Sequence, residues 1–336
     1  MRQSRALISE ALRNLKNNIE RTGDPLGLKN TYWTDWAEGL NLPKEGSTIL
    51  FTSRMYQMMP YIMQTTDLIS TFKPFLVMKG LKKVVRIGNR LAGEKIIRLK
   101  ARGAKDIKEK GAKSLKGIVA ALKASGVDPA YLYEAEPYSG VLLYDLGLDE
   151  NIGSYIKKVY ELLKKHGVEK VIATDPHTAY MLKVVYPEYI EGYDIEVKHY
   201  LEILSENKDS LEKACDFIPR EQFVIHDSCI MTRDLGIVEQ TRDVASSLGI
   251  ALLEPENTKL NTVCCGGPIE YAFADLSEKI SAIRIKELYG VTKNIVVNCP
   301  ICLINLSKYE KQLGLRVLDM GELFFEALKN QSESIQ

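Results

Sequence analysis

The chain has 336 residues, of which 45% are hydrophobic and 26% charged, so it has ample apolar material for a globular core. Its formal net charge of +1 at pH 7 excludes overall charge as a reason for binding nucleic acid or membranes. The length is typical of two domains or of one large domain.

The N-terminal sequence MRQSRALISEALRNLKNNIE lacks the apolar core and the cleavage site of a secretory signal peptide. We find no apolar run of about 18 residues that would be long enough to span a bilayer. These features predict a cytoplasmic protein. Because the cytoplasm is reducing, its six cysteines are expected to bind metal or to act in catalysis rather than to form disulfides.

Residues 1–46 are predicted to form a helical N-terminal extension, and a strongly basic segment follows at 73–116. That segment has 15 Lys or Arg residues against 3 Asp or Glu, with apolar residues at roughly helical spacing. The simplest interpretation is an amphipathic helix with a solvated basic face. The alternative is a docking surface for an acidic partner, a membrane or an anionic substrate. Nucleic acid is not expected, because the segment has few aromatic residues and no binding motif.

Five of the cysteines form a pattern in the C-terminal part of the chain. Cys229 is followed after 34 residues by the adjacent pair Cys264 and Cys265, and after 33 more by Cys299 and Cys302 in a Cys-x-x-Cys motif. Each gap has about the length of one helix plus one strand. The sixth cysteine, at position 215, lies outside the pattern and is predicted to be structural.

The sequence around these cysteines predicts alternating strands and helices. The runs EQFVIHDSC and NIVVNCPIC are rich in β-branched and aromatic residues, and a shorter apolar run in GIALLEPENTKLNTVCC precedes the adjacent pair. Helical periodicity follows in IVEQTRDVASSL, PIEYAFADLSEKISAIRIKELYG and LINLSKYEKQL. Repeated strand–turn–helix units predict a parallel α/β fold, with every cysteine group near the carboxyl end of a strand.

Five converging thiolates predict a metal centre. A structural zinc site needs four ligands, and a cubane iron–sulfur cluster needs four cysteines. Five thiolates that include an adjacent pair suit an iron–sulfur cluster with an unusual arrangement of irons. Zinc and inert buried cysteines are the alternatives. Gly266 and Gly267, directly after the pair, are predicted to let the backbone approach the bound group closely.

The segments HDSC, TVCCGGP and NCPIC resemble the motifs of the CCG domain in heterodisulfide reductase subunits B and D and in related iron–sulfur subunits. The resemblance covers nearly the whole chain, because these proteins are built from two such domains. It implies two tandem, pseudo-symmetric Rossmann-like CCG domains with parallel sheets, at residues 47–205 and 206–336. It also implies that one non-cubane [4Fe-4S] cluster is bound by Cys229, Cys264, Cys265, Cys299 and Cys302.

The first half repeats the second half without its cysteines. The aligned pairs of segments are ILFTSRM with VIHDSCI, VIATDPHTAYML with IVVNCPICLINL, and VKHYLEIL with VLDMGELF. Arg54 then stands at the position of Cys229, while Tyr138 and Ser139 replace the adjacent pair, and Asp175 and Thr178 replace the Cys-x-x-Cys motif. The basic segment is an insertion in this degenerate copy. The first copy is therefore expected to bind no iron–sulfur cluster by thiolates.

Three polar residues are predicted to assist the centre. Arg54 is expected to hold an anionic group, and His177 to move a proton at neutral pH. His226, shortly before Cys229, is expected to donate a hydrogen bond to a cluster sulfur and so to tune its potential. The alternative for Arg54 and His177 is a hydrogen-bonded filling of a lost site, and for His226 an ordinary satisfied histidine.

The resemblance implies a subunit of a heterodisulfide-reductase-like complex, in which the cluster reduces or forms disulfide or persulfide bonds of a small thiol in one-electron steps. The alternative is an electron-relay subunit of a dehydrogenase or membrane redox complex without its own disulfide chemistry. No cysteine precedes residue 215, so electrons are expected to come from separate subunits, first of all a ferredoxin-like iron–sulfur subunit of the C type. Membrane contact is expected only through a partner or through segment 73–116.

Overall fold

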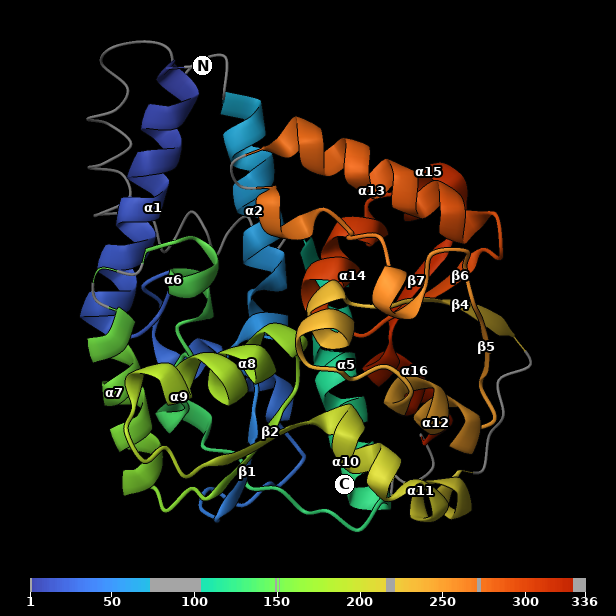
Figure 1. Cartoon of the computed structure of the whole chain (residues 1–336), viewed down its shortest axis with the longest axis horizontal. Helices are drawn as coiled ribbons and strands as arrows, with labels where there is room; N and C mark the ends of the chain where they lie inside the picture. The colour runs from blue at the N-terminus through green and yellow to red at the C-terminus, as the bar shows by residue number, and fades with distance from the viewer. Residues whose placement is uncertain are drawn as a thin grey trace.

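The structure is a computed structural model, and it describes residues 2–72, 104–148, 150, 152–215, 221–270 and 273–328. Most of the basic segment 73–116, as far as residue 103, lies outside the described residues. Two sheets are surrounded by helices, and every strand pair in both sheets is parallel (Figure 1). The predicted α/β class with parallel sheets is therefore confirmed.

The two sheets come from separate halves of the chain. The first has the order β1-β2-β3, and the second has the order β5-β4-β6-β7. The strands of the first sheet are β1 (Thr48–Phe51), β2 (Lys170–Ala173) and β3 (Glu196–His199). Those of the second sheet are β4 (Gln222–His226), β5 (Ala251–Leu253), β6 (Asn294–Val297) and β7 (Arg316–Asp319). Most strand residues of β1, β2, β4, β6 and β7 are buried, as expected when helices cover both faces of a parallel sheet.

The registers of the two sheets agree with the internal sequence alignment. In the first sheet Ile49 pairs with Val171, which pairs with Val197. The aligned residues of the second sheet pair in the same way, in the order Val224, Ile295 and Val317. This agreement supports an internal repeat, while the assignment to two tandem Rossmann-like domains stays a prediction.

The N-terminal extension is helical. It contains α1 (Arg2–Thr22) and the short 3-10 helices η1 (Asn30–Tyr32) and η2 (Asp35–Ala37). Ile19, Leu28 and Trp33 belong to the hydrophobic core around the first sheet, while Trp36 belongs to the larger core that continues into the second half. The extension is thus packed into the body of the protein.

The remaining helices of the first half are α2 (Met55–Phe72), α5 (Lys105–Ala124), η4 (Tyr133–Ala135), α6 (Val141–Asp145), α7 (Ile152–Lys165), α8 (Pro176–Tyr180), the π-helix η6 (Met181–Val185), α9 (Tyr186–Tyr189), α10 (Tyr200–Glu206) and α11 (Lys208–Ala214). Those of the second half are the π-helix η7 (Ile230–Asp234), α12 (Gln240–Ser247), η8 (Lys259–Asn261), η9 (Gly267–Ile269), α13 (Ala274–Tyr289), α14 (Pro300–Ser307), α15 (Glu310–Leu313) and α16 (Met320–Ala327). Among the described helices, none combines the length and apolarity needed to cross a bilayer.

Helices α5 and α16 join the two halves through backbone contact. A Cβ atom added to Gly117 would lie 1.8 Å from the carbonyl oxygen of Gly321, and one added to Gly321 would lie 2.3 Å from that of Ser114. The Nζ atom of Lys110 lies 2.7 Å from Glu310 Oε1 and 2.7 Å from the carbonyl oxygen of Val317. The described end of the basic segment is therefore part of a helix packed between the halves.

Gly117→Ala is expected to lower the free energy of unfolding by about 1–3 kcal/mol, because an added methyl group would meet a rigid backbone carbonyl at this crossing. Urea titrations of the wild type and the variant would measure the loss. Lys113→Ala is the control, because Lys113 is exposed on the same helix. Equal stability of the Gly117 variant and the wild type would contradict the close α5–α16 contact.

Candidate metal centre

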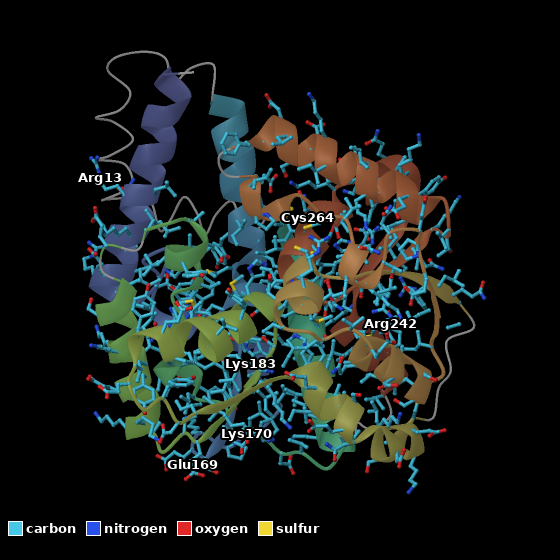
Figure 2. All side chains as sticks on the ribbon, in the orientation of Figure 1. Arg13, Glu169, Lys170, Lys183, Arg242 and Cys264 are labelled. Carbon is cyan, nitrogen blue, oxygen red and sulfur yellow. The ribbon has the colours of Figure 1, made fainter. Side chains whose placement is uncertain are left out.

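The structure brings the five patterned cysteines together from three segments. The Sγ atoms of Cys229 and Cys264 lie 4.0 Å apart. Those of Cys265 and Cys302, together with a ring nitrogen of His226, all lie within 4.8 Å of one another. Cys299 lies close enough to Cys302 to influence its ionisation and completes the group. Figure 2 shows sulfur atoms around the labelled Cys264, between α14 and the start of α13. These five residues are free thiols, and their role as cluster ligands stays a prediction.

Two of the three cysteine groups lie where the strand pattern predicts. Cys229 follows the end of β4 closely, and Cys299 is the N-cap of α14, with Cys302 in the first helical turn. The adjacent pair differs, because β5 ends at Leu253 and residues 254–263 intervene. The pair therefore reaches the centre on a long loop, and the expectation that it lies at the end of a strand is wrong.

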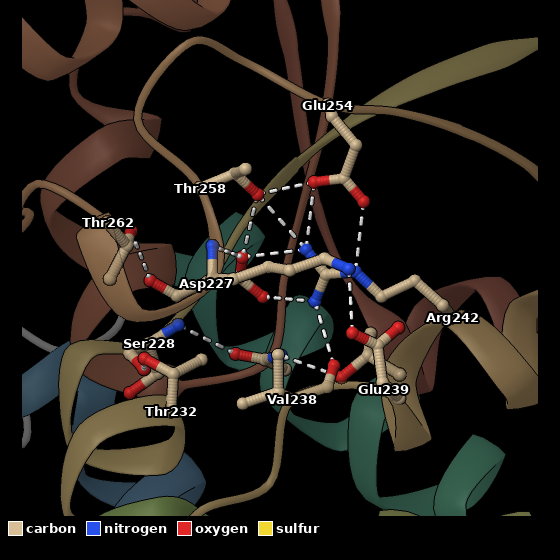
Figure 3. Close-up of polar contacts among 12 residues, drawn as sticks. Asp227, Ser228, Thr232, Val238, Glu239, Arg242, Glu254, Thr258 and Thr262 are labelled. Atoms are coloured by element: carbon tan, nitrogen blue, oxygen red, sulfur yellow. Dashed lines mark hydrogen bonds and ion pairs between the residues drawn. The ribbon is translucent and has the colours of Figure 1, made fainter.

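A buried ion pair holds that loop against the end of β4. Figure 3 shows Asp227, which is fully buried, between Arg242 and Thr258. Its carboxylate oxygens lie 2.6 and 2.7 Å from the Nη1 and Nη2 atoms of Arg242, and one of them accepts bonds from Thr258 Oγ1 and Lys259 N at 3.1 and 2.8 Å. Arg242 Nη2 also lies 2.9 Å from Glu254 Oε2. The network fixes the loop that leads to Cys264 relative to the strand that leads to Cys229.

Asp227→Asn is expected to lower the free energy of unfolding at pH 7 by about 2–3 kcal/mol, because hydrogen bonds to a charged group are lost. Burial opposes ionisation of Asp227, but the bonds from Arg242 outweigh it and lower its pKa. The pKa of an unfolded Asp is about 3.9. The stabilisation by the ionised Asp227 is therefore complete above that pH, and it disappears as the pH falls toward the lower pKa of the folded state. Urea titrations from pH 3 to 7 should therefore show that the free energies of unfolding of the wild type and the variant converge at acidic pH. A constant difference across that range would contradict the assignment, and Asp234→Asn, at an exposed position, is the control.

The two glycines after the adjacent pair lie in tightly packed backbone beside the cysteines, while their predicted approach to a bound group stays a prediction. Gly266 has φ +80°, in the left-handed region, and a Cβ on Gly267 would lie 2.5 Å from Cγ2 of Ile301. Their N–H groups donate to the Sγ atoms of Cys264 and Cys265 at 3.3 and 3.4 Å. These backbone dipoles favour negatively charged sulfur at the centre.

The thiols strongly influence one another's ionisation. Bonds from neighbouring thiols, first of all Cys229, lower the pKa of Cys264. Burial opposes ionisation of Cys299, but bonds from Cys302 and His177 outweigh it and lower the pKa of Cys299 well below its ordinary value. The neighbouring sulfurs and burial raise the pKa values of Cys229, Cys265 and Cys302. A cationic group would relieve the mutual repulsion that would otherwise keep these three thiols protonated.

His177 connects the first half to the centre. Its Nδ1 atom lies 3.0 Å from Asp145 Oδ2, at the end of α6, and its side chain lies close enough to Cys299 to interact with it electrostatically. Burial opposes protonation of His177, but Asp145 and the Cys299 thiolate outweigh it and raise its pKa well above the ordinary value. This position suits the predicted proton-carrying role, which stays a prediction.

Arg54 is bound to protein groups on several sides. It is 2% exposed, and its Nη1 atom lies 2.6 Å from Asp24 Oδ2, while Nη2 donates to Asn30 Oδ1 at 3.0 Å and to the carbonyl oxygen of Glu136 at 2.9 Å. These bonds hold Arg54 at φ +61°, in the left-handed region that non-glycine residues rarely adopt. The geometry favours the alternative interpretation, in which Arg54 fills the lost site and ties the N-terminal extension to it.

The other residues that replace cysteines also form internal contacts. The hydroxyl oxygens of Ser53 and Ser139 lie 2.6 Å apart, and the hydroxyl of Tyr138 accepts a bond from the N–H of Leu142. Asp175 is the N-cap of α8 and accepts a bond from the N–H of Thr178 at 3.0 Å. Hydroxyl and carboxylate groups thus take up the sheet edge that thiols occupy in the second half.

Three residues at the centre were missed by the sequence reasoning. Asp145 binds His177, Arg284 donates to Nδ1 of His226, and Asn305 donates to the carbonyl oxygen of Cys265. Asp145 and Arg284 are far in sequence from their partners, so no local pattern links them. Cys215 ends α11, with its Sγ atom 3.8 Å from the carbonyl oxygen of Leu248.

The donor set fits a soft metal centre. Thiolates favour zinc or iron–sulfur clusters over magnesium or calcium. Five thiols exceed the four that a zinc site or a cubane cluster uses. Nε2 of His226 is buried and has no hydrogen-bond partner among the described residues, as expected for a donor facing a bound group. The residues present therefore fit an iron–sulfur cluster with five thiolate ligands.

Comparison with known proteins agrees with this chemistry. Residues 223–307, which contain all five cysteines, match the family model for the cysteine-rich domain CCG. The closer likeness to heterodisulfide reductase subunits stays a prediction.

Three curated relatives are similar to this chain beyond the CCG domain. The "Probable iron-sulfur-binding oxidoreductase FadF" of Bacillus subtilis is 26% identical over 62% of this chain and 30% of its own length. The "EtfAB:quinone oxidoreductase" of Syntrophomonas wolfei is 28% identical over 63% of this chain and 31% of its own length. The "Probable membrane-anchored ferredoxin" of Chromohalobacter salexigens is 26% identical over 65% and 34%. The matches thus span only about a third of the length of these relatives.

Proposed function

We propose that this chain binds one iron–sulfur cluster through Cys229, Cys264, Cys265, Cys299 and Cys302 and works as an electron-transfer oxidoreductase. The observation that carries the proposal is the convergence of five thiols from three segments within the CCG domain. Two relatives bear the names of oxidoreductases and the third that of a ferredoxin.

We further propose that the cluster is a non-cubane [4Fe-4S] cluster, because five thiolates exceed the four that a cubane uses. When bound, such a cluster accepts and gives up single electrons. The protein's own residues set its surroundings. Cys265, Cys299 and Cys302 are buried and exclude water, while the N–H groups of Gly266 and Gly267 stabilise negative charge on sulfur.

His177 and Asp145 are proposed to hold a proton beside Cys299. Asp145 fixes the ring through Nδ1, and the proximity of His177 to Cys299 places a protonatable group next to a proposed ligand. A proton held there offsets negative charge at the centre when an electron arrives. The cysteine-free first half would in this way contribute to the centre without binding iron.

We favour an electron relay as the role of the cluster. Chemistry on a small disulfide needs an open cavity beside the metal. Cys265, Cys299 and Cys302 are buried. Two cavities elsewhere, of about 240 Å³ between α1 and α7 and about 220 Å³ beside α11 and α12, are not lined by any cysteine of the centre. A relay needs only a second redox centre nearby, which we propose is supplied by a ferredoxin-like iron–sulfur partner or a further redox subunit.

Disulfide or persulfide chemistry on a small thiol is the second candidate function. It is favoured by Cys229 and Cys264, which are only half-buried, and by a proton held at His177. In that case a substrate sulfur would approach from the Cys229–Cys264 side, and His177 would provide a proton for a departing thiolate.

Anaerobic iron and sulfide analysis with EPR spectroscopy tests both candidates. About four irons with acid-labile sulfide per chain are expected, because a [4Fe-4S] cluster has that content. If a thiol or disulfide labelled with ³³S broadens the EPR signal, substrate sulfur reaches the cluster and the second candidate is supported. A signal that no thiol alters supports the relay. Zinc without sulfide would contradict both.

A further inference from the structure

The ring of His226 is held on one side by a buried arginine. His226 ends β4 and is 1% exposed, and its Nδ1 atom lies 3.0 Å from Nε of Arg284, which is completely buried on α13. Nε2, on the other side of the ring, has no hydrogen-bond partner in the described part of the chain. The two ring nitrogens therefore have different surroundings.

Arg284 is itself fixed by several partners. Its Nη1 atom donates to Glu287 Oε2 at 2.7 Å and to the carbonyl oxygen of Asn257 at 2.8 Å, and Nη2 donates to Thr262 Oγ1 at 3.4 Å. Glu287 also accepts a bond from the N–H of Asn257 at 2.6 Å, which closes the network. The guanidinium group therefore has a defined orientation toward His226.

This arrangement determines which ring nitrogen carries the proton. Arginine has five N–H donors and no acceptor, and it stays protonated in proteins. Nδ1 of His226 must therefore offer its lone pair to Arg284 Nε, because two N–H groups cannot face each other at 3.0 Å. A neutral imidazole with an unprotonated Nδ1 carries its hydrogen on Nε2.

The ring of His226 lies beside the cysteines of the centre. A ring nitrogen of His226 lies within 4.8 Å of the Sγ atoms of Cys265 and Cys302, and Nε2 is the nitrogen that Arg284 leaves available. We propose that Arg284 is a positioning residue that fixes His226 as an Nε2–H donor toward sulfur at Cys265 and Cys302. The tautomer of His226 does not depend on the proposed function. The donation to sulfur of a bound cluster rests on it.

A hydrogen bond from Nε2 would raise the reduction potential of that cluster. The reduced cluster carries one more negative charge, and a donor to its sulfur stabilises that charge. Loss of the donor should shift the midpoint potential to a lower value. Arg284 would exert its effect through His226 alone, so its removal should add nothing once His226 is replaced.

Nitrogen NMR of the metal-free wild-type protein tests the positioning role directly. The protein has only four histidines, so ¹⁵N-labelled histidine gives few ring signals, and His226→Leu identifies those of His226. The expected result is an unprotonated Nδ1 and a protonated Nε2. A protonated Nδ1 in the wild type would overturn the proposal, whether or not any Arg284 variant folds. In Arg284→Met the His226 signals should move toward the other tautomer.

Redox titrations of the iron-loaded proteins, which measure the midpoint potential, test the donor role of His226. Arg284→Met and His226→Leu are each expected to lower the midpoint potential, and the double variant no further than His226→Leu. Arg233→Met is the matched control, because Arg233 holds the same loop through the carbonyl oxygens of Leu260 and Thr262. Unchanged potentials, or additive shifts, would overturn the donor role. A failure to take up iron and sulfide would contradict the proposed function, while the NMR result would still decide the tautomer.

Discussion

Replacing Cys299 with serine is expected to reduce the bound iron and acid-labile sulfide at least about tenfold. Removing a residue that is hydrogen-bonded to a metal ligand typically lowers metal affinity about 10–100-fold. Removing a ligand itself should lower the affinity at least as much. Cys299 is 1% exposed at the N-cap of α14, and it contacts both Cys302 and His177. A serine hydroxyl stays protonated at neutral pH and is a harder ligand than a thiolate. Iron and sulfide analysis after anaerobic purification measures the effect.

Cys215→Ser is the matched control for that experiment. Cys215 is a half-buried thiol near the carbonyl oxygen of Leu248, and it lies outside the five-cysteine pattern. Its replacement is expected to leave the iron content unchanged. If Cys299→Ser keeps its full iron content, four ligands suffice and the five-thiolate centre is wrong. If Cys215→Ser loses iron as well, the assay reports general instability of the fold.

Replacing Arg54 with methionine is expected to lower the free energy of unfolding by about 3–5 kcal/mol, the range for breaking a buried ion pair from one side. Asp24, its partner, is completely buried and would keep an uncompensated charge, although it also accepts bonds from the N–H groups of Leu26 and Leu28. Lys164→Met breaks an exposed pair with Asp194 and should cost no more than about 1 kcal/mol. Thermal or urea unfolding measures both losses.

The Arg54 experiment also separates the two interpretations of the cysteine-free site. If Arg54 ties the extension to the first sheet, Asp24→Asn should destabilise the protein too, and the double variant should be less destabilised than the sum of the two single changes. If Arg54 instead binds an anionic substrate, Arg54→Met should change substrate binding with little loss of stability. The observed contacts with Asp24, Asn30 and Glu136 favour the first outcome.

In the first half, Arg54, Ser139 and Asp175 stand at positions that align with cysteines and bond to neighbouring protein groups. This half also reaches the cysteine site of the second half. His177 follows Asp175, which aligns with Cys299, and both Asp175 and Cys299 are N-caps followed by proline at the start of a helix. This arrangement places α8 against the cysteine site, where His177 contacts Cys299. The first half therefore supplies a polar partner for the cysteine site of the second half.

The sequence by itself determined the class of the fold and the position of two of the three cysteine groups relative to the strands. Buried parallel strands are continuous apolar runs, and a side chain that directly follows such a strand must lie at the carboxyl edge of the sheet. This reasoning placed Cys229 and Cys299 correctly. It failed for Cys264 and Cys265, because the Asp227–Arg242 ion pair, formed across 15 residues, holds a loop that no periodic pattern reveals.

Only the tertiary structure decided what surrounds the thiols. Arg54 was predicted to hold an external anion, but Asp24 lies beside it, and an ion pair between an extension and a sheet depends on how they pack. The partners of His177 and His226 are Asp145 and Arg284, separated from them by 32 and 58 residues. Hydrogen bonds depend on distance and direction in space, whereas sequence patterns report only which face of an element is buried. The cysteines of the candidate centre could therefore be singled out from the sequence, while the residues that contact and orient their neighbours could not.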